Sequence, residues 1–322
     1  MRISKARQES DILIKETELV GYAPILDAID LALRSKYIRN EKPVSILLLS
    51  RAESGRTEAI KKFRLNDGIV MYRRFTAFGF LRDLIEGTVK LLFEKPRILP
   101  TIGIYDFNDL LNFKDETTSS TLEFINAVSE DGLSLESTYA IRPREMLRFK
   151  GTRGNFIGAI NTFGMFTYKR AVVKHMLYSG GFLSRPKIMS FDFSESVMHE
   201  IMDSLINNED HSKFVPSITL KLPKKRVDIS TSPEVNKELW KISSDIIARM
   251  NTKLIHFDMK GIRDFKTTRT LAKCSAQRDG RDNVSMKDVK RIRFLSKWIN
   301  LDMNPLETHY DFYEYCDRGL AS

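Results

Sequence analysis

Residues 50–57 combine the residue types that bind a phosphate group at the start of a helix. Ser50 is followed by four residues and then by Gly55, Arg56 and Thr57, between an apolar run and a helix-forming segment. A phosphate-binding loop has glycine and lysine where Ser50 and Arg56 stand, and it wraps backbone N–H groups around the phosphate. Gly55 supplies an open backbone, Arg56 a charge and Thr57 a hydroxyl ligand for Mg²⁺. We predict that Ser54, Gly55, Arg56 and Thr57 bind a nucleotide; an ordinary polar loop is the alternative.

A carboxylate that could hold the magnesium ion follows a second apolar run. Residues 101–105 predict a buried strand, and Asp106 stands at its end. Nucleotide-hydrolysing proteins place an aspartate beside Mg²⁺ at such a strand end, so Thr57 and Asp106 are the predicted metal ligands. The next residue would be a glutamate that orients the attacking water, but it is Phe107, which leaves Asp109 as the nearest carboxylate. The alternative reading of Asp106 is a helix cap or a loop residue.

The positive charge of the chain is concentrated in two places. The formal net charge is +10, from 52 Lys and Arg against 42 Asp and Glu. Residues 241–300 hold 15 Lys and Arg against 6 Asp and Glu, a net of +9. A second cluster lies in residues 142–153, where Arg148, Lys150 and Arg153 are candidate contacts to a nucleic-acid backbone. Phe149 could stack on a base or lie in the core, and a solvated charged face is the alternative for both regions.

Several other classes of protein are excluded by composition. Cys274 and Cys316 are too few for a disulfide framework and lack metal-ligand spacing, which favours an intracellular, reducing compartment such as the cytoplasm. The five histidines are scattered and predict no zinc site. No apolar run approaches the roughly 20 residues of a membrane helix, and the first residues are too charged for a signal peptide.

The order of predicted elements indicates an α/β fold. Apolar strands at 44–49, 68–73, 101–105 and 155–160 alternate with helices at 58–64, 80–93 and 119–130, which is typical of a parallel sheet flanked by helices. Residues from about 234 read as helices only, at 234–254, 261–277 and 285–299. We therefore predict an N-terminal helical segment (1–45), an α/β nucleotide-binding domain (46–230), a small all-helical lid (231–299) and a C-terminal tail (300–322).

Taken together, these motifs resemble the AAA+ ATPase superfamily, a group of P-loop NTPases, and within it the minichromosome-maintenance helicase-like branch. The resemblance spans about residues 15–295. Residues 21–24 are similar to the segment before the family's phosphate loop, 50–57 to a degenerate Walker A, and 102–106 to a Walker B without its glutamate. Residues 157–162 resemble a sensor-1 strand ending at Asn161, 181–186 an arginine-finger segment with Arg185, and 261–289 a helical lid with Arg263 at sensor 2.

The resemblance implies two functions for the same fold. In the first, the chain binds ATP and Mg²⁺ between the subunits of a ring or helical homo-oligomer and couples nucleotide state to DNA binding, loading or translocation. Asp106, Asp109, Asn161 and Arg185 would then be catalytic, and Arg56, Arg185 and Arg263 would give the nucleotide three cationic contacts. In the second, the chain is a non-hydrolysing scaffold or adaptor that oligomerises and binds nucleic acid. A basic α/β protein unrelated to nucleotides is the third reading.

Overall fold

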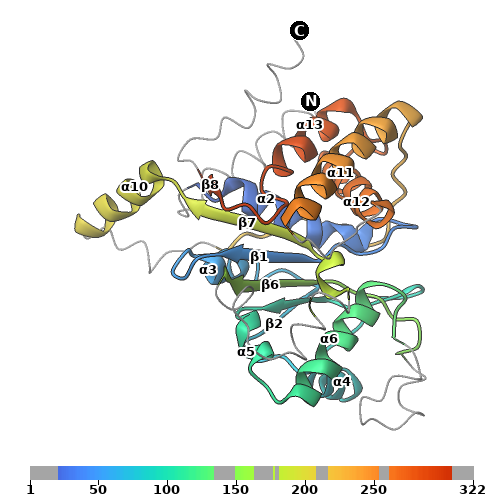
Figure 1. Cartoon of the computed structure of the whole chain (residues 1–322). Helices are drawn as coiled ribbons and strands as arrows, with labels where there is room; N and C mark the ends of the chain where they lie inside the picture. The colour runs from blue at the N-terminus through green and yellow to red at the C-terminus, as the bar shows by residue number, and fades with distance from the viewer. Residues whose placement is uncertain are drawn as a thin grey trace.

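In a computed structural model of the chain, residues 21–133, 149–162, 177, 181–207, 217–253 and 261–306 are described. Six parallel strands form one sheet in the order β2-β5-β6-β1-β7-β8, as Figure 1 shows for most of them. Their bounds are β1 Ile46–Ser50, β2 Ile69–Tyr72, β5 Thr101–Ile104, β6 Phe156–Asn161, β7 Lys187–Phe193 and β8 Asn304–Leu306. The predicted parallel α/β sheet is confirmed.

Strand β1 lies in the middle of the sheet, which explains its nearly continuous apolar sequence. All five of its residues are buried. Ile46 pairs with Ile157 of β6 on one side and with Lys187 of β7 on the other. A parallel strand with neighbours on both sides and helices on both faces has no solvated side, so alternation with polar residues is absent. The loop at residues 51–55 therefore leaves from the carboxyl end of a rigid central strand.

The helices gather in two groups, one on each side of the molecule. On the β7 side lie α11 (Pro233–Lys253), α12 (Ile262–Arg278) and α13 (Met286–Leu295), whereas α4 (Ala77–Ile85) and α6 (Asp115–Ser129) lie on the β2 side (Figure 1). The other helices of the described residues are α2 Ala23–Arg34, η1 Ser35–Tyr37, α3 Arg56–Lys61, α5 Phe107–Leu111, η3 Phe182–Ser184 and α10 Glu195–Ile206. The helix predicted over 80–93 is shorter, because Gly87 with φ 81° follows its end. Strands β3 (Phe93–Glu94) and β4 (Arg97–Ile98) form a small antiparallel pair nearby.

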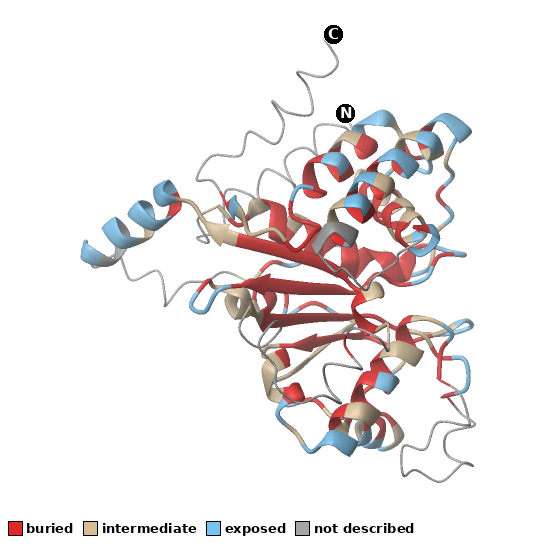
Figure 2. Ribbon diagram, in the orientation of Figure 1, coloured by how far each residue is buried: buried red, intermediate tan, exposed pale blue. Residues whose placement is uncertain are grey.

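One hydrophobic core joins the segments that the sequence divides into domains. A single cluster of buried side chains runs from Tyr22 to Leu306 and includes residues of α2, the sheet and α11–α13 (Figure 2). Helix α2 packs on α12, and β8, in the segment predicted as a tail, pairs with β7. The helices after residue 231 thus share a core with the sheet, while their role as a lid stays a prediction. Among the described residues, no helix combines the length and apolarity that a membrane crossing requires.

Candidate functional site

The loop at the carboxyl end of β1 is held in one conformation by its own hydroxyl groups and by Tyr22. The hydroxyls of Ser50 and Ser54 are hydrogen-bonded, and Ser54 is buried. Gly55 has φ 75°, in the left-handed region that favours glycine, and α3 begins at the next residue. A Cβ on Gly55 would lie 3.0 Å from the hydroxyl oxygen of Tyr22, which covers the loop. Tyr22 belongs to the Gly-Tyr-Ala-Pro segment at residues 21–24 and contacts the loop directly.

The guanidinium of Arg56 turns back onto the strand ends. Its Nη1 donates to the Ser50 carbonyl oxygen at 2.7 Å and also to the carbonyl oxygen of Ile160. The side chain therefore bridges the carboxyl ends of β1 and β6. Burial lowers the pKa of Arg56, and the nearby Tyr22 and Asp106 partly oppose that shift. In this conformation the predicted phosphate-binding cation serves as a clamp between two neighbouring strands.

Thr57 and Asp106, the predicted metal ligands, come together at the same edge of the sheet. The Thr57 hydroxyl donates to the carbonyl oxygen of Tyr105 at 3.2 Å, one residue before Asp106. Asp106 Oδ1 accepts from the backbone N–H of Asn108 at 2.9 Å and from its side-chain amide at 2.7 Å. Asp106 is thus the N-cap of α5, the alternative considered from the sequence, and its carboxylate still lies near Arg56. Asp109 lies in the first turn of α5.

Phe107 stands where the resemblance leads us to expect a glutamate, and its side chain lies in the hydrophobic core. The residue is fully buried. Its ring centroid lies 5.9 Å from that of Phe156 and 5.4 Å from that of Phe182. A Cβ on Gly158 would come within 3.1 Å of the Phe107 ring, so the glycine makes room for it. The Phe107 side chain therefore points into the hydrophobic core beside the sheet and away from the loop at residues 51–55.

Asn161 lies between the loop and Asp106. It is the last residue of β6, pairs with Ser50 in the register, and is half-buried. Because β6 separates β1 from β5, Asn161 at its carboxyl end lies between the two predicted binding segments. The structure thus brings Arg56, Thr57, Asp106 and Asn161 to one edge of the sheet. No group of three metal-ligating side chains is present within the described part of the chain.

Arg185 and Arg263 lie at the opposite, amino-terminal edge of the sheet. Arg263 Nε is 2.7 Å from Glu130 Oε1, and Arg185 Nε is 4.0 Å from the same oxygen. Lys42 Nζ donates to the other carboxylate oxygen of Glu130 at 2.8 Å. Burial lowers the pKa of Arg185, and the neighbouring charge of Arg263 lowers it further. Within one chain the strands of the sheet separate Arg263 from Arg56, and the expected contact of Arg185 with the nucleotide of a neighbouring subunit stays a prediction.

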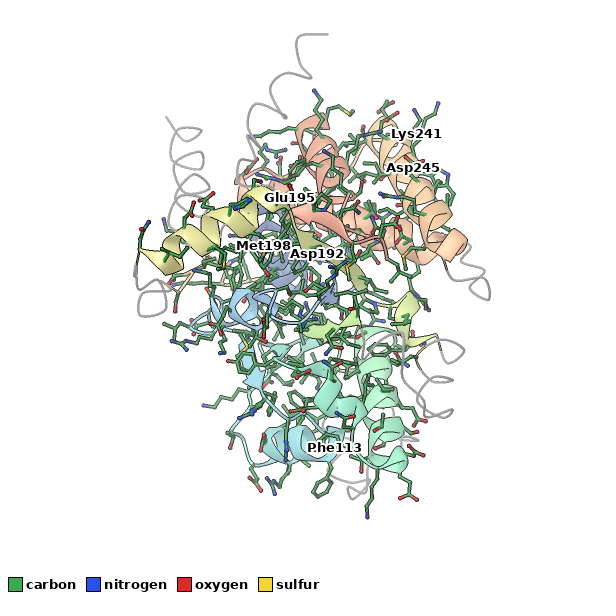
Figure 3. All side chains as sticks on the ribbon, turned by 60° about the vertical axis from the view of Figure 1, so that its left-hand side comes forward. Phe113, Asp192, Glu195, Met198, Lys241 and Asp245 are labelled. Carbon is green, nitrogen blue, oxygen red and sulfur yellow. The ribbon has the colours of Figure 1, made fainter. Side chains whose placement is uncertain are left out.

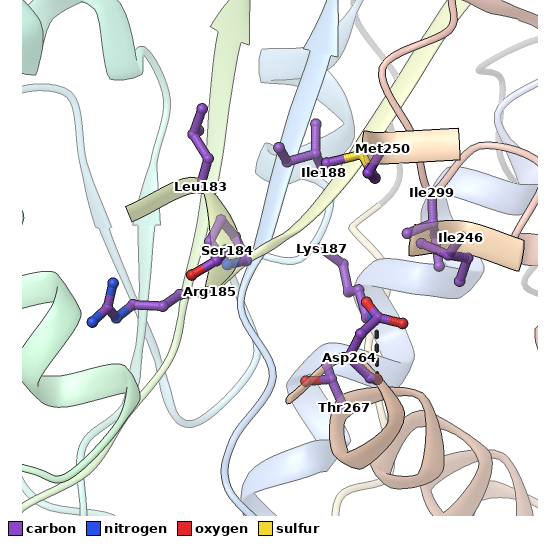
Figure 4. A pocket seen from close by; sticks show the side chains of 11 residues that line it. Leu183, Ser184, Arg185, Lys187, Ile188, Ile246, Met250, Asp264, Thr267 and Ile299 are labelled. Carbon is purple, nitrogen blue, oxygen red and sulfur yellow. Dashed lines mark hydrogen bonds and ion pairs between the residues drawn. The ribbon is translucent and has the colours of Figure 1, made fainter. Parts of the chain in front are cut away.

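A buried ion pair lies at the start of β7, on the same amino-terminal edge of the sheet. Lys187 pairs with Asp264 and lies near Thr268, as Figure 4 shows for the first two. Both side chains line a small pocket together with Ser184, Arg185 and Thr267 (Figure 4). Glu130 and Asp264, which organise the cations at this edge, were not identified from the sequence, because acidic residues on helices carry no signal of their distant partners.

The predicted nucleic-acid contacts also lie toward the amino-terminal edge. Lys150 is exposed, and Arg153 is half-buried just before β6. Burial and the positive charges of Arg39 and Arg153 lower the pKa of Arg226, whereas Asp228, which pairs with Arg39 at 2.7 Å, raises it. Phe149 is buried in the core and is thereby removed from the candidates for base stacking. Arg148 lies outside the described residues.

Comparisons with known proteins give no independent assignment. No protein-family model matches the chain, and no curated protein matches it significantly.

Proposed function

We propose that the chain is a non-hydrolysing, AAA+-like scaffold that forms a homo-oligomer and binds nucleic acid, with DNA as the first candidate. The observation that carries the proposal is the place of Phe107. The residue after Asp106 would have to orient water for hydrolysis, and it is an aromatic side chain committed to the core. The Arg56 clamp on two carbonyl oxygens supports the same conclusion, since phosphate binding would require those hydrogen bonds to break.

The nucleic-acid part of the proposal is supported by the charge at the amino-terminal edge. Arg39, Lys150, Arg153 and Arg226 come from segments far apart in the sequence and are at least partly accessible. Such a surface favours a polyanionic backbone without reading its sequence. The oligomeric part is supported by Arg185 and Arg263, which could approach the phosphate loop only of a neighbouring chain in a head-to-tail arrangement.

Binding of Mg²⁺-ATP and slow hydrolysis form the second candidate function. The observation that favours it is the common position of Thr57, Asp106 and Asn161 beside the loop after β1. In that case Thr57 and Asp106 would contact the magnesium ion, and the loop from Ser54 to Thr57 would contact the phosphates. Asp109, half-buried in the first turn of α5, would be the carboxylate left to act on water.

Nucleotide titration and turnover separate the two candidates. Wild type, Arg56→Ala and the control Arg82→Ala, on the surface of α4, are titrated with Mg²⁺-ATP by calorimetry and assayed for phosphate release. The scaffold predicts no phosphate release above background for any of the three proteins. Turnover that is lost in Arg56→Ala and kept in Arg82→Ala would establish the second candidate. Absence of nucleotide binding would remove the second candidate and leave the scaffold, with its oligomerisation and nucleic-acid binding.

The nucleic-acid surface is tested by charge reversal. Lys150→Glu with Arg153→Glu should weaken binding to a DNA oligonucleotide in fluorescence anisotropy and reduce the slope of log K against log salt by about 1 to 2. The control is Arg82→Glu with Lys90→Glu. It changes the net charge by the same amount, and both residues are exposed on another surface of the molecule. Equal weakening of DNA binding in both double variants would show a general effect of net charge. Unchanged binding in Lys150→Glu with Arg153→Glu would refute the assignment of these residues to the DNA-binding surface.

A further inference from the structure

Helix α10 presents an apolar stripe to solvent. It begins after β7 and projects from the body of the molecule, largely exposed along its length (Figures 1 and 2). Val197 is fully buried at its base, whereas the exposed fractions of Met198, Met202 and Ile206 are 44%, 48% and 70%. These three residues recur every four positions, so they form one continuous line on the helix surface. A solvent-facing stripe of this kind marks an interaction surface, and methionine adapts well to a partner.

The charges of α10 define the kind of partner that this stripe would accept. Glu195, Glu200 and Asp203 are all exposed, and the helix contains no Lys or Arg. Glu195 and Asp203 flank the apolar line at helical spacing. Figure 3 shows Glu195 and Met198 together near the base of α10. The matching surface must therefore be apolar at its centre and basic around it.

Such a surface is present on α11 and α12. Trp240 is 43% exposed and Ile262 is 63% exposed. Phe265 packs edge-on against Trp240 with ring centroids 5.6 Å apart, and the Arg269 guanidinium lies 5.7 Å from the centre of the Phe265 ring. A Cβ on Gly261, the residue before Ile262, would lie 3.5 Å from the Trp240 ring, so the start of α12 lies close to the tryptophan. Exposed Lys237 and Lys266 complete the Trp240–Ile262 patch.

The stripe and the patch face different sides of one chain. Helix α10 leaves the carboxyl end of β7, whereas Ile262 begins α12 next to Arg263, which lies at the amino-terminal edge of the sheet. Figures 1 and 3 show α10 and α11 apart on opposite sides in both views. We propose that α10 of one copy docks on the Trp240–Ile262 patch of the next copy. The contact is heterologous, so repetition produces a closed ring or an open filament.

This inference deepens the oligomerisation part of the proposed function. It rests on exposure and charge alone, and its test contains neither nucleotide nor nucleic acid. Failure of α10 docking would therefore leave the loop and the DNA surface untouched. Conversely, a chain that binds neither ATP nor DNA could still assemble through α10.

Sedimentation velocity over a range of protein concentrations tests the contact. Wild type should increase in mass with concentration, whereas Met202→Asp and Ile262→Asp should each stay monomeric with unchanged circular dichroism. An equimolar mixture of the two variants should form dimers that grow no further, because one variant keeps the patch and the other keeps the stripe. Leu65→Asp, at an apolar residue that is 68% exposed elsewhere, is the control and should assemble as wild type does.

Charge exchange provides the second arm of the test. Glu195→Lys with Asp203→Lys, and separately Lys237→Glu with Lys266→Glu, should each weaken assembly about tenfold, since each places like charges opposite one another. All four changes in one chain should restore it. A monomeric wild type, a mixture of Met202→Asp and Ile262→Asp that stays monomeric, or a fourfold variant that is not restored would each overturn the proposal. Protection of Met198 and Met202 from oxidation in monomeric Ile262→Asp would show that a segment of the same chain covers the stripe, with the same consequence.

Discussion

Replacement of Phe107 by a carboxylate tests whether this position can serve hydrolysis at all. Phe107→Glu introduces the residue that a nucleotide-hydrolysing site would have there, and Phe107→Gln has nearly the same shape without the charge. Both lose the packing of a fully buried ring against Phe156 and Phe182, a loss of about 3–5 kcal/mol by analogy with truncation of buried aromatic residues. The difference between the two variants isolates the cost of the charge.

The sign of that difference follows from the direction of the pKa shift. A carboxyl group in this aromatic environment would have a raised pKa, so the folded chain would keep the proton at neutral pH while the unfolded chain releases it near pH 4.3. The unfolded state then binds fewer protons, and the free energy of unfolding falls as pH rises. Between pH 5 and pH 7, Phe107→Glu should lose about 2.5 kcal/mol relative to Phe107→Gln, at 1.36 kcal/mol for each pH unit.

Urea denaturation followed by circular dichroism at pH 5, 6 and 7 measures this difference, with Phe107→Leu as the reference for conservative repacking. Phe107→Glu should show no gain of phosphate release at any of these pH values. Equal stabilities of the Glu and Gln variants across the range would mean that the side chain at 107 reaches water. That result, or ATP turnover gained by Phe107→Glu, would refute the argument that the core excludes a catalytic glutamate.

Two further predictions concern polar side chains at the two edges of the sheet. Burial lowers the pKa of Lys36 to about 7 from 10.5, so the unfolded chain holds a proton that the folded chain releases, and stability should rise with pH between these values. Relative to Lys36→Met, the wild-type free energy of unfolding should increase by about 2 kcal/mol from pH 7 to pH 9 in urea titrations; parallel curves would contradict the shift. Asp106→Ala should cost about 1 kcal/mol through loss of the hydrogen bond from the Asn108 N–H, and Asp106→Asn should cost less because it keeps the cap. Equal losses in the two Asp106 variants, measured by thermal unfolding, would argue against a capping role.

Local patterns in the sequence correctly predicted most of the strands and helices around the candidate site. The apolar run of β1 and the one ending at Asp106 predicted buried strands, because strands covered on both faces cannot tolerate regular polar positions. The helices at 233–253 and 262–278 followed from their length and period. Strand β7 was not predicted, because its sequence interrupts the apolar residues with Lys187 and Ser190, whose polar atoms are satisfied by partners far along the chain. Helix α10 was not predicted either.

The sequence by itself determined which residue types stand at the ends of β1, β5 and β6, and hence that a loop, a hydroxyl and a carboxylate meet at one edge of the sheet. Only the tertiary structure decided the direction of each side chain. Arg56 folds onto carbonyl oxygens, Phe107 enters the core, and Arg185 joins Arg263 at Glu130 on the opposite edge. The physical reason is that spacing along a chain fixes backbone position, whereas side-chain direction depends on which distant groups satisfy a charge or fill a space.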